Sequence, residues 1–172
     1  LDENRSFTES SPTQTNSPYS ASKASSDAFV RAFYTTYRVP TIITNCSNNY
    51  GPRQHREKFI PTILKRLKAN KKVPVYGDGL NVRDWLYVDD HCDAINLVME
   101  NGRLGERYNI GGGKEISNIE LVKTIINALQ KDEDMIQFVD DRAGHDLRYS
   151  IDCSKIEKEL GYKPKNTFEQ GI

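Results

Sequence analysis

The sequence shows no excess of charge of either sign, because 24 basic side chains balance 24 acidic ones among its 172 residues. No basic stripe dominates, so nucleic acid is not an expected partner. No apolar run approaches the length of a membrane span, and the opening residues lack the pattern of a secretory signal, so no membrane association is expected. The three cysteines are odd in number and far apart, which fits neither a disulfide framework nor a zinc ribbon. We expect no metal site and a reducing, cytoplasmic compartment.

Both ends of the chain suggest that it is incomplete. Residues 1–17 are rich in Ser, Thr, Asn and Glu and predict a loop. Residues 167–172 resemble the first turn of a helix that is then cut off. A polar opening loop before an α/β pattern leads us to expect that the first half of a sheet is missing.

The most informative residues are Tyr19 and Lys23, a phenol and an ammonium four positions apart. In a helix this spacing places them on one face, one turn above the other. A nearby ammonium favours the ionised phenol, which could then take a proton from a sugar hydroxyl while a nicotinamide takes the hydride. The alternative is a solvated Tyr and Lys on an exposed helical face, since short motifs often occur by chance.

The residues around this pair predict half of a parallel α/β unit. Pro18 favours the start of a helix, and small and apolar residues then recur at helical spacing, giving one face suited to packing on a sheet. Pro40 disfavours helix at the residue before it and predicts an end near Arg38. The β-branched run 41–44 then predicts a buried strand, and the amide-rich residues 45–53 predict a loop at its carboxyl end, where ligands of open α/β sheets bind.

Alternating patterns predict further elements along the rest of the chain. Ser117 and Glu120 have the spacing of a capping box, and Asp89 or Asp90 could cap a helix that runs to Gly102. The glycines 77, 79 and 161 mark turns or helix ends. The expected helices are 58–70, 89–102, 119–129 and 155–160, and the expected strands are 73–76, 82–88, 107–110 and 135–139.

Together these residues resemble the carboxyl-terminal part of the dTDP-glucose 4,6-dehydratases, nucleotide-sugar enzymes of the extended short-chain dehydrogenase/reductase group. The Tyr-x-x-x-Lys spacing is shared by the whole superfamily, whereas Asn-Asn-Tyr-Gly-Pro at 48–52 and Arg-Asp-Trp at 83–85 are much more specific. The matching segments occur in the family's order and cover nearly the whole chain: 17–27, 45–52, 76–79, 83–88, 108–112 and 141–146.

The resemblance implies an α/β fold, namely the carboxyl-terminal part of a Rossmann-like doubly wound parallel sheet plus a smaller mixed α/β lobe that binds the nucleotide-sugar. Residues 1–50 would end the NAD-binding domain, with the Tyr-x-x-x-Lys helix and the next strand. Residues 51–172 would form mainly the substrate lobe, with about 84–110 returning to the Rossmann sheet. A homodimer through the Tyr19 helix is also implied.

The resemblance also implies roles for individual residues. Tyr19 would accept the proton of the sugar 4-hydroxyl during oxidation by NAD, and Lys23 would hold the nicotinamide ribose and tune Tyr19. Asn49 would lie near the cofactor. The residues expected at the dTDP-sugar are Asn48 at the diphosphate, Lys58 and Phe59 at the nucleotide-sugar, Pro74 and Tyr76 at the base, Arg83 and Arg142 at the diphosphate, and Asn118 and His145 completing the site.

Several of these residues have simpler interpretations. Guanidinium forks suit a diphosphate, but Arg83 could instead form a surface ion pair with Asp84 or Asp78. His145, in a charged loop, could be a solvated histidine. Asn118 could be an ordinary residue in the first turn of its helix.

Two parts of the family's machinery have no counterpart in this sequence. The Gly-rich turn that brings the NAD pyrophosphate to a helix amino terminus is missing, since residues 111–113 have the wrong spacing and lie too late. The Thr-Asp-Glu segment that supplies the acid and base for dehydration is missing too, and Asp2 and Glu3 are not assigned that role. We therefore expect the whole enzyme to convert dTDP-glucose to dTDP-4-keto-6-deoxyglucose and water, and this chain alone to be inactive.

Two other functions remain open at this point. A UDP-sugar 4-epimerase or decarboxylase of the same superfamily would share Tyr19, Lys23 and a Tyr-Gly-Pro loop. A non-catalytic fragment that binds a nucleotide-sugar, or one that cannot fold alone, belongs to a different class.

Overall fold

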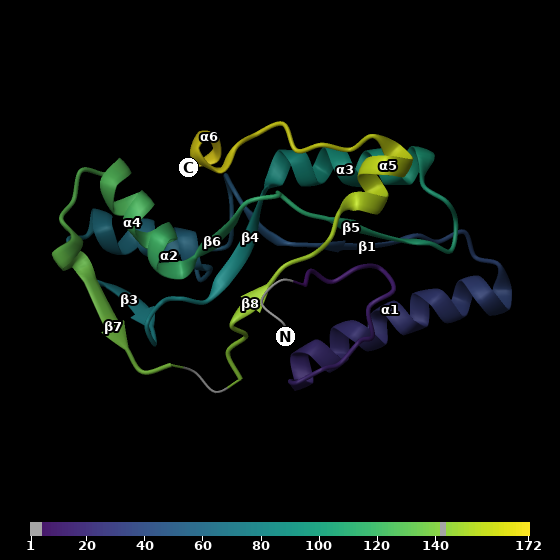
Figure 1. Cartoon of the computed structure of the whole chain (residues 1–172), viewed down its shortest axis with the longest axis horizontal. Helices are drawn as coiled ribbons and strands as arrows, with labels where there is room; N and C mark the ends of the chain where they lie inside the picture. Colours follow the sequence, from purple (N-terminus) through teal and green to yellow (C-terminus); the bar gives the residue numbers. More distant parts are fainter. Residues whose placement is uncertain (1–4, 142–143) are drawn as a thin grey trace.

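The structure is a computed structural model that describes residues 5–141 and 144–172. Helices and strands alternate along the chain, as the sequence predicts (Figure 1). Their bounds, in chain order, are α1 (Pro18–Tyr37), β1 (Ile43–Cys46), β2 (Asn48–Tyr50), α2 (Phe59–Lys68), β3 (Val73–Tyr76), β4 (Val82–Tyr87), α3 (Val88–Asn101), β5 (Arg107–Ile110), β6 (Glu115–Ser117), α4 (Asn118–Ala128), the 3₁₀ helix η1 (Glu133–Met135), β7 (Ile136–Val139), β8 (Arg148–Tyr149), α5 (Ser154–Leu160) and α6 (Phe168–Gly171).

Parallel strand pairing dominates the three small sheets. Strand β1 pairs with β5, and β3 pairs with β7, both in parallel. In the third sheet β4 pairs in parallel with β2 and β8, and antiparallel with β6. The fold is therefore mixed α/β with mostly parallel pairing, in agreement with the predicted class.

Helices cover the sheets on different sides (Figure 1). Strands β1 and β5 lie between α1 on one side and α3 and α5 on the other, while α2 and α4 lie over β3 and β7. Strand β5 pairs with β1. The division into two domains at residue 50, with about 84–110 returning to the Rossmann sheet, stays a prediction.

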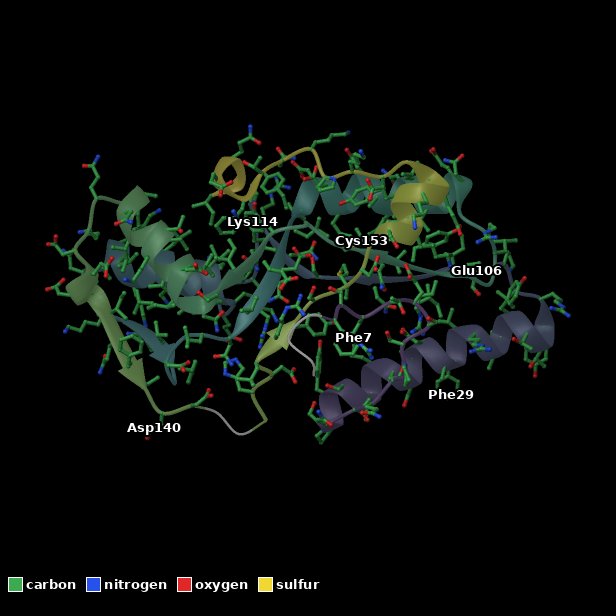
Figure 2. All side chains as sticks on the ribbon, viewed as in Figure 1. Phe7, Phe29, Glu106, Lys114, Asp140 and Cys153 are labelled. Atoms are coloured by element: carbon green, nitrogen blue, oxygen red, sulfur yellow. The ribbon has the colours of Figure 1, made fainter. Side chains whose placement is uncertain are left out.

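Helix α1 forms where the sequence predicts it, but its apolar face is exposed. Ser17 caps it by accepting a hydrogen bond from the Ser20 amide, and Arg38 ends it with a left-handed φ of 55°. Phe29 is 67% exposed and lies on the outer side of the helix (Figure 2), and Phe33 is 50% exposed. The prediction that this face packs on the sheet of this chain was wrong, because the half-buried residues of the helix are instead Ala24, Asp27, Val30 and Tyr34. Among the described residues, no helix is long and apolar enough to cross a bilayer.

Asp27 lies on the side of α1 that faces β1 and β5. Its carboxylate accepts a hydrogen bond from Asn45 Nδ2 at 3.2 Å and pairs with the Arg107 guanidinium at 3.3 Å. These partners lie on β1 and β5 respectively, so a single side chain fastens the helix to both strands of the pair.

The expected elements differ from the observed ones in several places. The region 45–53, predicted to be a loop, contains strand β2, and the short strands β6 and β8 were not predicted. Strand β1 begins two residues later than expected, and its four residues are only half-buried. Tyr87 occupies the N-cap position of helix α3 without a side-chain hydrogen bond, so Asp89 and Asp90 lie in the first turn of the helix. The missed strands β2, β6 and β8 have two or three residues each and are stabilised by pairing with β4. Local sequence patterns do not reveal such pairing.

Two clusters of buried side chains form the core. One joins α2, α4 and β3 around Ile63, Leu67 and Ile125, each fully buried. The other joins α3, β5 and α5 around Tyr108 and Ile156, which are also fully buried. Strand β4 contributes to both, because Trp85 belongs to the first cluster and Leu86 to the second.

The carboxylate of Asp90, in the first turn of α3, is only 2% exposed and holds the final segment of the chain. It accepts hydrogen bonds from the Lys165 amide at 3.1 Å, the Asn166 amide at 3.0 Å and Asn166 Nδ2 at 3.0 Å. A buried carboxylate is tolerated when it is hydrogen-bonded in this way. This contact leads the chain into α6, whose Phe168 is buried in the first cluster.

We expect Asp90→Ala to lower the free energy of unfolding by about 3 kcal/mol, because three hydrogen-bond donors lose their buried acceptor. Urea denaturation of the 172-residue chain measures this effect. Asp93→Ala is the matched control, since the Asp93 carboxylate forms a 2.6 Å ion pair with Lys165 that is largely exposed. Equal losses in the two variants would contradict the assignment of Asp90 as an anchor.

Candidate functional site

Tyr19 and Lys23 lie one turn apart near the start of α1, as their spacing predicts. Tyr19 is 73% exposed, so its phenol is accessible from solvent. One turn beyond Lys23 in the helix, the Asp27 carboxylate accepts a hydrogen bond from Asn45 Nδ2 at 3.2 Å. Asn45 is followed by Cys46, which ends strand β1. The pair therefore belongs to the part of α1 on the side of the carboxyl end of a parallel strand, where ligands bind in sheets of this type.

Asn48 and Asn49 lie on strand β2, opposite Trp85 and Leu86 of β4. The Asn49 carboxamide is held at both ends. Its Nδ2 donates to the Ser47 carbonyl at 3.0 Å and to Cys46 Sγ at 3.3 Å. Its Oδ1 lies 2.7 Å from His91 Nδ1.

Tyr50 anchors the far end of β2 in the core. It is 2% exposed, and its ring lies 6.2 Å from that of Trp85, 5.6 Å from that of Tyr87 and 5.2 Å from that of Phe168. The hydroxyl donates to the Phe168 carbonyl at 3.4 Å. Burial, and after it the negative charge of Asp90, raises the pKa of Tyr50 to about 12.

Arg83, on β4, is a buried side chain with 9% exposure. Its guanidinium donates to the carbonyl of Val82 at 2.7 Å and to that of Asp146 at 2.8 Å. Asp84 lies next along the strand, and side chains of successive strand residues point to opposite faces. The Asp84 carboxylate accepts from the Gly112 and Lys114 amides, both at 2.9 Å. The interpretation of Arg83 as a surface ion-pair residue was therefore wrong.

Hydrogen bonds to the Asp146 carbonyl, made directly or through Asn81, connect the segments that contain Arg83, Asn118 and His145. Besides the bond from Arg83, this carbonyl accepts a hydrogen bond from Asn81 Nδ2 at 3.2 Å, and the Asn81 carbonyl accepts one from the Asn118 amide at 3.0 Å. His145, adjacent to Asp146, has its Nδ1 2.7 Å from Asp141 Oδ1, and its side chain is only 6% exposed. His145 is therefore a paired and covered histidine, and the interpretation of it as a solvated one was wrong.

The starts of two helices hold two more of the predicted residues. Asn118 is the first residue of α4, where Ser117 and Glu120 form the predicted capping box. Lys58 precedes α2 and is exposed, and Phe59 begins it. Arg142, predicted at the diphosphate, lies outside the described residues.

Pro74 and Tyr76 lie on one face of β3, because residues two apart on a strand share a face. Val73 and Val75 on the other face are fully buried, whereas Tyr76 is 46% exposed. Gly79 ends the following turn with a φ of 75°, and a Cβ there would lie 2.7 Å from the Val75 side chain. Its carbonyl accepts from the Ile119 amide at 2.9 Å, which ties this turn to the start of α4.

None of the predicted residues lines a hollow of about 470 Å³ elsewhere on the surface. Its walls include Asp84, Gly111, Cys153 and Tyr162. Because Asp84 and Arg83 point to opposite faces of β4, this hollow is separate from the candidate site.

The structure adds two residues that the sequence did not indicate. His91 contacts Asn49, as described above. Tyr149 of β8 is the register partner of Arg83 on β4, so the two side chains share a face of the sheet. Burial, and after it the nearby Cys46 and Asp146, raises the pKa of the Tyr149 phenol, whereas Arg83 opposes this rise. Neither residue belongs to a recognisable motif, so only the fold could reveal them.

Comparison with known proteins shows the family to which the chain is similar. A family model described as GDP-mannose 4,6 dehydratase matches residues 1–172. The dTDP-glucose 4,6-dehydratase of Xanthomonas campestris pv. campestris is 52% identical over 181 residues, which cover 100% of this chain and 52% of that protein. The chain thus spans about half the length of the curated relatives it matches.

Solved structures give the same result. The dTDP-glucose 4,6-dehydratase of Bacillus anthracis in complex with NAD superposes with a TM-score of 0.95 at 53% identity, over 99% of this chain and 54% of that one. The Streptomyces venezuelae enzyme with NAD and dTDP bound gives 0.96 at 51% identity, over 98% and 52%. A UDP-glucose 4-epimerase of Thermotoga maritima with UDP-glucose gives 0.90 at 28% identity, over 96% and 54%.

The raised pKa of Tyr50 predicts a loss of stability in alkali. The folded state holds this proton more tightly than the unfolded state, where tyrosine has a pKa of about 10. The stabilisation is therefore complete below pH ~10 and is lost as the pH rises toward 12. We expect Tyr50→Phe to remove up to about 2 kcal/mol of this alkaline loss.

Urea denaturation of the chain at a series of pH values from about 9 to 12 measures this effect. Tyr37→Phe, which alters an exposed tyrosine, is the control. If Tyr50→Phe lost stability with the same slope as the unsubstituted chain, burial of the Tyr50 hydroxyl would not be the cause.

Proposed function

The chain belongs to the family described by the GDP-mannose 4,6 dehydratase model, and we propose that the whole protein is a dTDP-glucose 4,6-dehydratase. It would convert dTDP-glucose to dTDP-4-keto-6-deoxyglucose and water with tightly bound NAD, as a step in making deoxysugar precursors. The observation that carries this proposal is the 52% identity to a dTDP-glucose 4,6-dehydratase over the full chain. The 28% identity to the epimerase is much lower.

The proposed redox residues are Tyr19 and Lys23. Tyr19 would accept the proton of the sugar 4-hydroxyl, and its 73% exposure supports access by a substrate. Lys23, one helical turn from Tyr19, would donate to the nicotinamide ribose. Asn49 would lie near the cofactor, close to the same end of β1.

The residues of this chain fit one end of NAD. Asn49 contacts Cys46 Sγ, and Lys23 lies one turn before Asp27, which contacts Asn45 of β1, so the chain offers a carboxamide and an ammonium on the side of the carboxyl end of β1. The chain has no Gly-rich turn of dinucleotide-binding spacing, so the pyrophosphate would be held elsewhere in the whole protein. When bound, oxidised NAD would accept a hydride from carbon 4, and the reduced form would return it to carbon 6.

The proposed nucleotide-sugar site centres on Arg83. Arg83 donates to the Asp146 carbonyl, His145 precedes Asp146 in the chain, and Asn118 is linked to the same carbonyl through Asn81, which supports a shared role of these three residues at the diphosphate. Asn48 and Arg142 would complete that role. Pro74 and Tyr76 would contact the base, and Lys58 and Phe59 would contact the nucleotide-sugar, which their places at one face of β3 and at the start of α2 allow.

The test uses a completed protein, in which this chain is joined to the part of the Xanthomonas campestris relative that it does not match. We expect turnover of dTDP-glucose but not UDP-glucose, and no turnover by the 172-residue chain alone. Tyr19→Phe should lower kcat by roughly a hundredfold or more while binding persists, because the proton acceptor is lost. Arg83→Ala should weaken dTDP binding roughly tenfold or more, because charged hydrogen bonds to the diphosphate are lost.

Calorimetry with dTDP and UDP, together with product analysis, separates the candidate functions. Lys123→Ala is the control for Arg83→Ala, because it removes an exposed cation of α4 that is paired with Glu133 of η1. Epimerised UDP-sugar as the product would indicate an epimerase. Binding without turnover in the completed protein would indicate a non-catalytic binding protein, and product from the isolated chain would contradict the expectation that it is inactive.

We also propose that the completed protein is a cytoplasmic homodimer that pairs through α1. The exposed Phe29, Phe33 and Tyr37 and the absence of buried residues in this helix support the pairing. The unpaired state of all three cysteines supports the reducing compartment, which cell fractionation would test.

We expect Phe29→Arg to convert the completed protein from dimer to monomer, because a charge would be placed in an apolar interface. Sedimentation velocity measures the change. Met99→Arg, at a 71% exposed position on α3, is the control and should remain dimeric. A Phe29→Arg variant that stayed dimeric would place the interface elsewhere.

A further inference from the structure

His91 lies in the first turn of α3 and contacts a residue of the candidate site from outside every motif that the sequence offered. We propose that His91 is a positioning residue that fixes the Asn49 carboxamide at the carboxyl end of β1 for binding of the dinucleotide cofactor. This inference rests on the proposed function, because it takes Asn49 as a cofactor-binding residue.

The contacts of Asn49 determine how its carboxamide is oriented. A backbone carbonyl only accepts hydrogen bonds, so the group 3.0 Å from the Ser47 carbonyl is the NH₂ of Asn49. The carboxamide oxygen then faces His91 Nδ1, at 2.7 Å. An amide oxygen also only accepts, so Nδ1 of His91 carries the proton. The Ser47 carbonyl thereby fixes both the orientation of the amide and the tautomer of the imidazole.

Burial favours a neutral imidazole at this position. His91 is half-buried, and burial lowers its pKa because the charged form loses hydration. The neutral ring with its proton on Nδ1 still donates to Asn49, so the contact does not require a charged histidine. Both partners are therefore in their ordinary state near neutral pH.

The Asn49 carboxamide keeps two hydrogen-bonding positions for a ligand. One lone pair of Oδ1 remains beside the bond from His91, and the second N–H is directed at the Cys46 thiol, which is a weak acceptor. The positive charge of Lys23 acts on the same thiol, since it opposes the rise in the Cys46 pKa that burial causes. A hydroxyl or amide of the nicotinamide nucleoside could replace the thiol contact without disturbing the bonds to Ser47 and His91. Without His91, the carboxamide would lose one of its two strong contacts and could rotate away.

The backbone shows why this support is needed. Residues 46–49 join the end of β1 to β2 with only Ser47 between the two strands, and the strands belong to different sheets. The Ser47 amide donates to the Ile110 carbonyl of β5 at 3.0 Å, and β2 pairs with β4. His91 fastens this crossing point to α3, which follows β4 directly.

The experiment compares three variants of the completed protein. His91→Phe keeps a ring of similar size but has no donor, and His91→Asn restores an N–H near the position of Nδ1. His55→Phe is the matched control at an exposed histidine. We expect His91→Phe to weaken NAD binding roughly threefold to tenfold, His91→Asn to recover most of the loss, and His55→Phe to change nothing. The affinity for dTDP should stay within about twofold in every variant, because Asn49 is not a predicted diphosphate residue.

Nitrogen-15 NMR of the completed protein gives a readout independent of NAD. The neutral His91 ring should carry its proton on Nδ1, and Asn49→Ala should abolish that preference. A bare Nδ1 would overturn the contact itself. Unchanged NAD affinity in a folded His91→Phe protein, or an equal loss of dTDP and NAD affinity, would overturn the positioning role. A completed protein that bound no NAD would overturn the proposed function together with that role, while the NMR signal would still show whether the contact exists.

Discussion

The first turn of α3 is the point on which the remainder of the structure depends. Asp90 faces the carboxyl-terminal segment and holds residues 165 and 166 through three hydrogen bonds to its buried carboxylate. His91, the next residue, contacts Asn49 on the other side. Helix α3 follows β4 without a loop, and β4 pairs with β2, β6 and β8. A shift of this turn would therefore displace residues of the core and of the candidate site together. Stability and site geometry therefore have a common origin in two adjacent polar side chains.

The extent to which the sequence predicted the fold follows from the range of the interactions involved. Helix α1 was predicted with its start and end because Pro18 and Pro40 act locally. The capping box of Ser117 and Glu120 is local as well. Strands β2, β6 and β8 were missed because two or three residues carry no period of their own, and their partners on β4 are far away in sequence. The apolar spacing of α1 was read correctly as a helix, yet spacing alone could not show what that face contacts.

The candidate site was predicted unevenly for the same reason. The pair Tyr19 and Lys23 is contained in one helical turn, so its geometry is fixed by spacing. Arg83 was identified only through a family resemblance, and its burial depends on Asp146, whose carbonyl meets it across the sheet. His91 and Tyr149 have no local signal, because their roles arise from contacts with Asn49 and from the register with Arg83. Long-range pairing of this kind becomes visible only when the strands are placed.

The two halves of the candidate site belong to two structural supports: α1 with β1 and β5, and the sheet of β4 with α4. The alignment of the site depends on how these two supports are joined. Tyr19 and Lys23 belong to α1, which is fastened to β1 and β5 by the polar contacts of Asp27. Arg83 and Asn118 belong to the sheet of β4 and to α4, around the larger apolar cluster. Residues 43–50 link these supports directly, since β1 and β2 are separated by Ser47 alone. A nucleotide-sugar that reached from Arg83 to Tyr19 would span both supports, so the rigidity of this link would decide whether the sugar hydroxyl meets the phenol. The bonds of Asn49 to Ser47 and His91 are the side-chain contacts that stiffen it.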